Sequence, residues 1–344
     1  MIIRINFILF LCSIQTVFFG QNSVYETSSF KFLNIPTSSR QNYLGKAAIA
    51  TFEPQIDIAL ANPALIQFHT RGKVLASSAY YFTSLYGNVA YGLNNYKYDI
   101  PYVVGANFIS YGEQIQTDVD GNIIGKFIPN EISTYIAASK TYKNYNFGST
   151  IKFAYGNYLL ASSAGVAMDL SMLYRDEERE VYATLLLKNI GHQFIGRNTQ
   201  SAPMPFDIQL ALSKKLKHLP FRLTIMAQEI HNWTSLNNSS DYYLFPLDPF
   251  VTINDNDLLT ILMSKFVFSG EFTLGKAFRF GASYDVKKSI EGRFDAFRGL
   301  QGLALGFGIY TRKYDFGYSY SRLTPISVNH QFTFGINLRE IKTK

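Results

Sequence analysis

Histidine, cysteine and serine could carry catalysis or bind a metal ion in this chain, but their spacing points to neither role. None of the five histidines lies at metal-ligand spacing from another histidine or from the only cysteine, Cys12. Ser28 and Lys31 match the Ser-x-x-Lys pattern of penicillin-binding enzymes, yet the Lys-Thr-Gly motif that completes this set is absent. We therefore predict that the protein is not an enzyme and has no catalytic residue, metal site or cofactor.

Four charged residues within alternating apolar runs are the remaining candidates for function: Lys152, Asp207, Arg222 and Arg279. Each lies on the polar face of its alternating run, and the aromatic and aliphatic residues of that run lie on the other face. A lysine or arginine that faces lipid near the bilayer midplane costs about 2–4 kcal/mol, so these charges are expected to face a polar lumen. They could form an internal ion-pair network that rigidifies the protein, or they could line a pore. Buried networks are often structural, which favours the first reading.

The elements that would position these charges are strands. Apolar residues recur at every second position from about Val74 to Leu338, which is typical of strands with one face toward lipid. These roughly 265 residues, at about 9–11 per transmembrane strand plus turns, allow about 12–14 strands, and bacterial barrels have even numbers. We therefore predict an all-β, transmembrane antiparallel β-barrel of about 14 strands. The clearest runs are 145–155, 206–213, 221–228, 278–284, 303–309 and 314–321.

The composition agrees with a membrane barrel. Hydrophobic residues make up 47% of the chain and aromatic residues 16%, but no apolar run after the N-terminal segment is long enough to span a bilayer as a helix. Barrels carry aromatic girdles at both membrane interfaces, which accounts for such an aromatic content. The net charge is +7 without a cluster of five or more basic residues, so we expect contact with outer-membrane lipid and no nucleic-acid partner.

The chain is expected to divide into four regions. Arg4, an apolar run and Gly20 indicate a signal peptide, which would include Cys12 and direct the mature protein to the outer membrane. The residues that follow lack alternation and suggest a plug or a periplasmic element. The predicted regions are a signal peptide at 1–20, an N-terminal segment or plug at 21–72, a transmembrane β-barrel at 73–338 and a C-terminal tail at 339–344.

Turn and loop signals separate the alternating runs. The segment 233–257 is the most loop-like, and we predict that it is the longest external loop. Asn256 or Asp257 could cap a short helix over 258–263, ahead of a strand over 266–274. Asp118–Asn122 is only faintly similar to a calcium loop, because its glycine is misplaced and no closing glutamate follows, so a turn is predicted.

Short segments spread over the chain combine into a recognisable pattern. Near the start lie Phe-Leu-Asn-Ile-Pro-Thr-Ser-Ser-Arg at 32–40, Leu44-Gly45 and Asn62-Pro63-Ala64. Further on lie Leu-Lys-Asn-Ile-Gly at 187–191, Pro-Phe-Asp-Ile-Gln at 205–209, Ser-Lys-Lys-Leu at 213–216, His-Leu-Pro-Phe-Arg at 218–222 and Trp233. With these segments the chain resembles the PorV/PorQ family of outer-membrane barrels, which belongs to the type IX secretion system of Bacteroidota. The later segments resemble the PorQ-type members in particular.

This resemblance implies a barrel similar to the fourteen-stranded long-chain fatty-acid transporter fold. It also implies membership of a cell-surface attachment complex with proteins of the PorU, PorV and PorZ types. In such a complex the PorU type is a sortase-like protease, the PorV type receives cargo and the PorQ-type barrel holds the PorZ type at the surface. The resemblance therefore implies a non-catalytic component that anchors PorZ and supports cargo attachment to the cell surface.

Two other functions are open from the sequence. An outer-membrane transporter of hydrophobic compounds would share the fold, and Asn62-Pro63-Ala64 lies near where such barrels place their plug. Internal charges that seal the lumen would count against transport. A lipid hydrolase would need a Ser-His-Asp set near the lipid face, and His330, at the start of the last predicted strand, is the one histidine even loosely placed for it.

Overall fold

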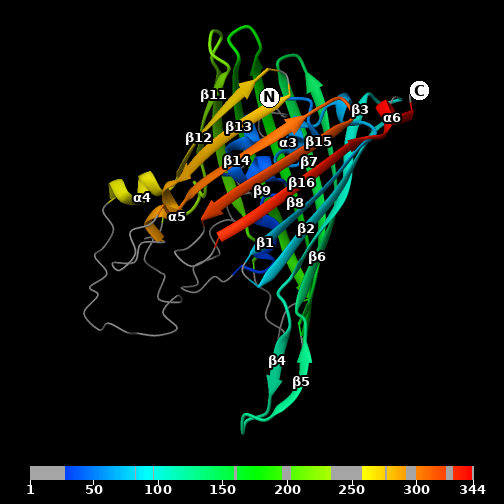
Figure 1. Cartoon of the computed structure of the whole chain (residues 1–344), viewed down its shortest axis with the longest axis vertical. Helices are drawn as coiled ribbons and strands as arrows, with labels where there is room; N and C mark the ends of the chain where they lie inside the picture. The colour runs from blue at the N-terminus through cyan, green and yellow to red at the C-terminus, as the bar shows by residue number, and fades with distance from the viewer. Residues whose placement is uncertain are drawn as a thin grey trace, which may run out of the picture.

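Fourteen strands close into an antiparallel barrel in this computed structural model (Figure 1), which confirms the predicted fold class. β1 (Lys73–Tyr81) pairs with β2 (Ser84–Asn95) on one side and with β16 (Val328–Asn337) on the other, and this last pairing closes the ring. The predicted signal peptide and most of the predicted 233–257 loop lie outside the described residues. The structure describes residues 28–81, 83–95, 97–158, 161–195, 203–233, 258–275, 277–291, 300–322 and 328–342.

The barrel strands follow one another around the ring, except that a β4–β5 hairpin is inserted between β3 and β6. Each predicted alternating run coincides with one strand to within three residues at its ends, because side chains in a strand point alternately to its two faces. The other strands are β3 (Ile100–Ser110), β4 (Gln114–Thr117), β5 (Ile123–Phe127), β6 (Asn130–Tyr142), β7 (Tyr145–Tyr158), β8 (Ala161–Asp176), β9 (Val181–Ile195), β10 (Asp207–Lys215), β11 (Phe221–Ala227), β12 (Phe266–Leu274), β13 (Phe278–Asp285), β14 (Leu303–Tyr310) and β15 (Tyr314–Arg322).

The two faces of each strand differ in chemistry. In β7, Phe147, Ile151 and Phe153 are exposed on the outer face, whereas Lys152 and Ala154 are buried inside. The same arrangement around the ring builds an apolar outer belt, as lipid requires. Members of this belt include Val89, Phe108, Ile132, Leu212, Ile225, Phe268, Phe280, Phe316 and Phe332.

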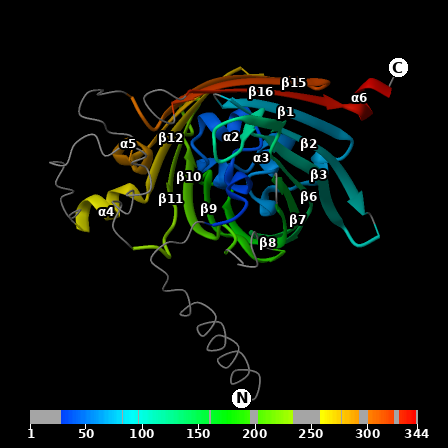
Figure 2. The same ribbon diagram turned by 90° about the horizontal axis from the view of Figure 1, so that it is seen from below.

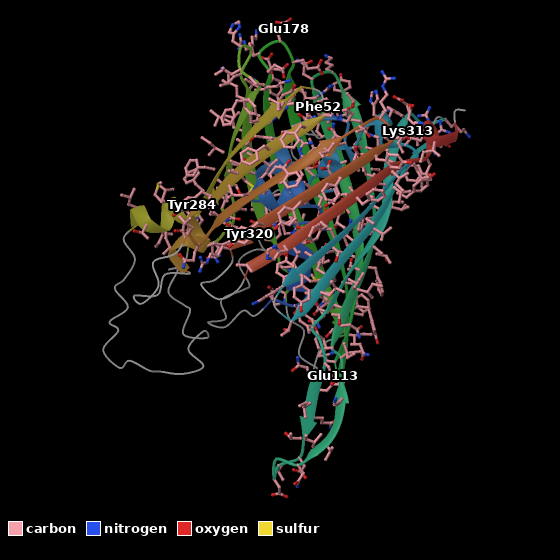
Figure 3. All side chains as sticks on the ribbon, viewed as in Figure 1. Phe52, Glu113, Glu178, Tyr284, Lys313 and Tyr320 are labelled. Atoms are coloured by element: carbon pink, nitrogen blue, oxygen red, sulfur yellow. The ribbon has the colours of Figure 1, made fainter. Side chains whose placement is uncertain are left out.

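The two ends of the barrel differ in the length of their connections. At the end where β1 begins and β16 ends, the turns are short, as at 143–144, and Glu178 and Lys313 mark this end in Figure 3. At the opposite end several connections are longer, among them 111–129, whose hairpin carries Glu113 away from the ring. Outer-membrane barrels have short periplasmic turns and long external loops, so the hairpin belongs to the external side.

The described residues that precede β1 lie inside the barrel, where Figure 2 places α2 and α3 within the ring of strands. We call residues 28–72 the plug. Its apolar side chains pack on the inner wall, as Ile49 does with Leu186 of β9 and Met226 of β11. The plug consists of η1 (Lys31–Asn34), α2 (Ser39–Tyr43), η2 (Ala47–Ala50), α3 (Ile56–Ala59), η3 (Pro63–Leu65) and η4 (Phe68–Thr70).

One turn of the plug, η3, sits directly on the barrel wall. The Asn62 side chain caps η3 by accepting a hydrogen bond from the Ala64 N–H at 2.9 Å, and Pro63 starts it. The Ala64 N–H also donates to Ser171 Oγ of β8 at 3.0 Å. At Gly148 of β7 a Cβ atom would come within 2.1 Å of the Ala64 nitrogen, so only glycine allows this contact.

Three short helices flank the strands. The first, α4 (Leu258–Ser264), confirms the helix predicted over 258–263, and β12 confirms the strand predicted after it. The second, α5 (Val286–Glu291), follows β13. Among the described residues, no helix is both long and apolar enough to cross a bilayer.

The third helix, α6 (Leu338–Lys342), corrects the predicted end of the barrel, which was placed at Leu338. β16 ends one residue earlier, at Asn337, opposite Lys73 at the start of β1. Beyond this point β1 offers no further partner. The Asn337 side chain instead accepts a hydrogen bond from the Arg339 N–H at 3.3 Å, which favours a helical turn.

Candidate functional site

Arg40 lies inside the barrel on α2 of the plug, and its side chain is 0% exposed. Ser38 caps α2, because its hydroxyl accepts a hydrogen bond from the Gln41 N–H at 3.3 Å. At the other end of this helix the Tyr43 ring packs against the wall so closely that a Cβ at Gly281 would lie 2.5 Å from it. The cap and this contact together fix the direction in which Arg40 points.

The Arg40 guanidinium joins the plug to the wall. Its Nε and Nη2 donate to the two carboxylate oxygens of Glu271 in β12, at 2.8 and 2.7 Å. Nη2 also donates to Glu53 Oε2 of the plug at 2.7 Å. A two-pronged arginine–carboxylate pair is among the strongest side-chain contacts in proteins, so this contact holds α2 against β12.

Two of the predicted lumen charges complete this arrangement. Arg222 of β11 pairs with Glu53 Oε1 at 3.0 Å. Arg279 of β13 pairs with Glu53 Oε2, and its Nη1 lies 3.8 Å from Glu271 Oε2. We call Arg40, Glu53, Arg222, Glu271 and Arg279 the central cluster. It is an ion-pair network, and it links the plug to three adjacent strands.

Two tyrosines and an aspartate surround the central cluster. Tyr43 donates to Glu271 Oε1 at 2.9 Å. The Tyr310 ring centroid lies 5.3 Å from Cζ of both Arg40 and Arg279, and its hydroxyl donates to Asp57 Oδ2 at 2.7 Å. With Asp57, three carboxyl groups stand beside three guanidinium groups. A balanced set of this kind is the form in which charges are tolerated inside a protein.

The pKa of Glu53 follows from this position. Burial alone would raise the pKa, but the guanidinium groups of Arg40, Arg279 and Arg222 hold it well below the ordinary value of 4.5. A carboxyl group with a depressed pKa stabilises the fold fully above its unfolded pKa and loses that contribution as the pH falls toward its folded pKa. Burial raises the pKa of Asp57, so that group has the opposite pH dependence.

We expect Glu53→Gln to destabilise the folded barrel by about 3–5 kcal/mol at pH 7, because it leaves three arginines without their shared partner. This deficit should shrink below about pH 4.5. There Glu53 becomes protonated in the unfolded wild-type chain, whereas its lowered pKa keeps it ionised in the folded protein. The measurement is urea unfolding of both proteins in detergent at pH 7 and pH 3.5. A deficit of the same size at both pH values would contradict the role given to Glu53.

Lys152, the third predicted lumen charge, belongs to a separate group. Its ammonium lies 2.7 Å from Asp169 Oδ2 of β8 and donates to Asn189 Oδ1 of β9 at 2.8 Å. Asn189 in turn donates from Nδ2 to Asn34 Oδ1 of the plug at 2.9 Å. This group therefore also connects the wall to the plug.

Asp207, the fourth predicted charge, is buried but stands apart from both groups. Its carboxylate accepts hydrogen bonds from Gln209 Nε2 at 2.6 Å and from the Glu229 N–H at 2.7 Å. All four predicted residues are thus buried on the inner side, and only Arg222 and Arg279 share a partner. The polar alternation correctly indicated the inner face, but it could not indicate which charges would meet.

The sequence analysis missed three members of the central cluster. Glu271 could have been found, because it falls on the same face as Val267 and Ser269 in a strand that was predicted. Arg40 and Glu53 carried no such signal, since the plug has no strand periodicity. Their role becomes visible only once the plug is placed inside the ring.

The described residues contain no cluster of histidine, cysteine, aspartate and glutamate side chains suited to a metal ion. His330, the histidine considered for a hydrolase, has its Nδ1 2.9 Å from the Tyr318 hydroxyl, and its ring packs on Tyr318 and Tyr320. These contacts fit an aromatic cluster of the wall.

The buried ion pairs join the plug to the wall and can hold the plug in place.

No protein-family model and no curated protein matches the chain in sequence. Solved structures with similarity to it include a Pseudomonas aeruginosa FadL homologue, at 9% identity over 88% of this chain and 98% of that chain, with a TM-score of 0.46. The TodX monoaromatic hydrocarbon channel matches at 9% identity over 81% and 92%, with a TM-score of 0.42. Omp33 of Acinetobacter baumannii matches at 8% identity over 77% and 96%, with a TM-score of 0.38.

The class of the protein follows from its own geometry. Strands cross a bilayer only as a closed ring, because every backbone N–H and C=O must be paired in the absence of water. This chain closes such a ring with 14 strands, turns apolar side chains outward and buries Lys152, Arg222 and Arg279 on its inner side. The protein is therefore an outer-membrane-type β-barrel, located in the outer membrane, with residues 28–72 of its own chain inside the lumen.

Proposed function

We propose that this barrel is a non-catalytic anchor in the attachment complex of a type IX secretion system. It would hold a PorZ-type protein at the cell surface, together with PorU-type and PorV-type proteins. The observation that carries the proposal is the β4–β5 hairpin, which extends from the external end and exposes apolar side chains to water. The exposed members are Ile115, Val119, Ile123, Ile124 and Ile128.

A hairpin with exposed apolar side chains is expected to bind another protein. Two strands alone form a marginal structure in water, and exposed apolar patches on soluble surfaces commonly mark protein interfaces. The outer strand edges of β4 and β5 are unpaired in the described chain, so a partner could also add a strand. The family resemblance supplies the partner, a PorZ-type surface protein.

The filled lumen supports an anchor over a pore. The plug is fixed to the wall by the central cluster, by Lys152 through Asn189, and by η3 against Gly148. One cavity between the plug and the wall, beside Lys152, measures about 60 Å³. A space of this size holds a few waters and is too small for a substrate to pass.

We expect the double variant Ile115→Ser and Ile124→Ser to lose its PorZ-type partner. Burying one isoleucine stabilises an interface by about 1.5–3 kcal/mol, so each substitution should weaken binding about tenfold or more. The measurement is affinity purification of the tagged barrel from its native membrane, followed by quantification of the proteins that accompany it.

Leu219→Ser is the matched control, because Leu219 is 59% exposed, like Ile115 at 57%, but lies in a short turn at the opposite end. It should retain the partner. Equal recovery of the partner with the hairpin variant and with the control would overturn the assignment of this surface. Cargo that stays attached to the surface of cells lacking the barrel would overturn the proposed function itself.

Transport of a hydrophobic compound is the second candidate, and one observation favours it. An open hollow of about 500 Å³ lies on the wall at β6–β9, lined in part by Phe147, Leu170 and Met172. It adjoins Gly148, where the plug touches the wall. Uptake of a fatty acid by liposomes containing the purified protein would favour transport, whereas the anchor proposal expects no uptake above that of empty liposomes.

A further inference from the structure

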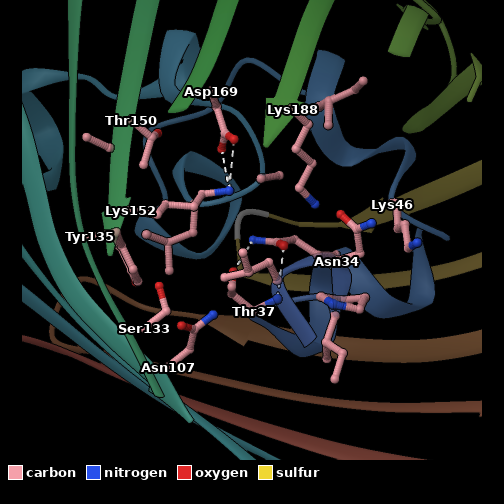
Figure 4. A pocket seen from close by; sticks show the side chains of 18 of the residues that line it. Asn34, Thr37, Lys46, Asn107, Ser133, Tyr135, Thr150, Lys152, Asp169 and Lys188 are labelled. Carbon is pink, nitrogen blue, oxygen red and sulfur yellow. Dashed lines mark hydrogen bonds and ion pairs between the residues drawn. The ribbon is translucent and has the colours of Figure 1, made fainter. Parts of the chain in front are cut away.

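A cavity of about 60 Å³ lies between the plug and the inner wall, with Lys46, Lys152 and Lys188 around it (Figure 4). Lys46 belongs to the plug, and the other two belong to β7 and β9. Asp169 is the one carboxylate among the residues that line the cavity. The lining therefore carries three cations and one anion.

A bulge in the wall brings these charges together. The register between β8 and β9 shifts next to Asp169, and Asn189 takes a φ of 55°. Two successive β9 residues, Lys188 and Asn189, consequently both turn toward the lumen, although neighbours in a regular strand point to opposite faces. Bulges in β-sheets often re-aim a side chain at a functional position.

Only one of the three lysines has a partner that neutralises it. Lys152 is paired with Asp169 and donates to Asn189. The ammonium groups of Lys46 and Lys188 have no hydrogen-bond or ion-pair partner among the described residues. Both residues line the cavity, and Figure 4 shows the Lys188 side chain directed into it. Asp207 acts on both electrostatically, but its oxygens are engaged by Gln209 and the Glu229 N–H.

Unpaired charges inside a protein are costly and are normally neutralised. An isolated buried ammonium either gives up its proton or takes a counter-ion. Burial and the nearby Lys288 lower the pKa of Lys46, while Asp285, Asp207 and Glu229 act in the other direction. A small anion placed between two ammonium groups would satisfy both at once.

The opposite wall of the cavity offers a further donor. Ser133 of β6 is 1% exposed, lines the cavity and has no partner for its hydroxyl. A volume of about 60 Å³ is roughly four times the space that one water requires, which suits a group such as phosphate or acetate but not an acyl chain.

We propose that this cavity binds a small oxyanion, a free phosphate or a short carboxylate, held between the Lys46 and Lys188 ammonium groups. The anion would join the plug to β9 and so help to keep the plug in place. A ligand that binds only the folded protein stabilises it by mass action, so the anion should also raise the resistance of the barrel to unfolding. This inference does not depend on the identity of the surface partner.

The test is isothermal titration calorimetry of the full-length protein in detergent, with inorganic phosphate, acetate and chloride as separate titrants at constant ionic strength. We expect saturable one-site binding of phosphate or acetate and none of chloride. Lys46→Met and Lys188→Met should each weaken that binding at least tenfold. Lys217→Met, in an exposed turn, is the matched control and should bind like the wild type.

Each outcome decides for or against the site. Tighter binding of phosphate or of acetate identifies which of the two oxyanions the cavity takes. Absence of saturable binding of both anions by the wild type would overturn the proposal, whether or not the variants fold. Binding that survives both lysine substitutions would overturn it as well, since the anion would then sit elsewhere.

Discussion

Replacing Arg40 with methionine is expected to destabilise the folded barrel by about 3–5 kcal/mol, because one partner of a buried ion pair is removed and the other is left behind. Three hydrogen bonds disappear, two of them to Glu271. Arg222 and Arg279 still neutralise Glu53. Glu271 is therefore the carboxylate that is left without its main partner. The measurement is the free energy of unfolding in urea, in detergent, for the variant and the wild type.

Two comparisons make this result specific to the plug contact. Arg40→Lys keeps the charge but loses the two-pronged geometry, and it should fall between the wild type and Arg40→Met. Arg179→Met removes an arginine that is 81% exposed and should change stability by less than about 0.5 kcal/mol. An Arg40→Met protein as stable as the Arg179→Met protein would show that the central cluster does not hold the plug.

The second large effect is expected from Gly148→Val, which alters the seat of the plug without touching any charge. The new side chain would occupy the space of the Ala64 nitrogen, 2.1 Å from its Cβ, so η3 must leave the wall. Overpacking of this kind typically costs about 1–3 kcal/mol, while valine itself suits a strand. We expect the barrel to form with its plug displaced.

Limited trypsin digestion of the reconstituted protein measures that displacement. Cleavage at Lys46, which is half-buried inside the barrel in the wild type, should appear in the Gly148→Val protein. Gly125→Val is the control, because a Cβ there meets only Gln116 Oε1, at the ordinary contact distance of 3.5 Å. A plug as resistant in the Gly148→Val protein as in this control would contradict the close seat of η3.

The barrel could be predicted from the sequence because inward-facing and outward-facing side chains alternate along each strand. Lipid on one side and a polar lumen on the other impose the alternation seen in β7, so the same pattern locates a strand and gives the direction of Lys152. The helix at 258–263 could also be predicted, since the sequence offers a suitable capping residue at 256 or 257 and a strand pattern after it.

The alternating pattern could not predict the plug contacts or the anion cavity. Arg40 lies on the five-residue helix α2 and Glu53 in an irregular segment of the plug, and packing against the wall sets the position of both. Lys188 follows the inward parity of Thr184 and Leu186, but Asn189 also faces the lumen because of a bulge, and a bulge interrupts the alternation on which the prediction rested. The β4–β5 hairpin was missed for a related reason: its turn at Asp118–Asn122 was predicted, but strands of four and five residues are too short for a clear period.

The central claim is that the plug seals this barrel, so that it serves as an anchor and not as a pore. Recording single-channel currents from the full-length protein in planar bilayers tests this claim most directly, with the Arg40→Met protein measured alongside. We predict a silent wild type and current steps from the variant, whose plug is loosened. Steady, voltage-independent conductance from the wild-type protein, equal to that of Arg40→Met, would contradict the claim.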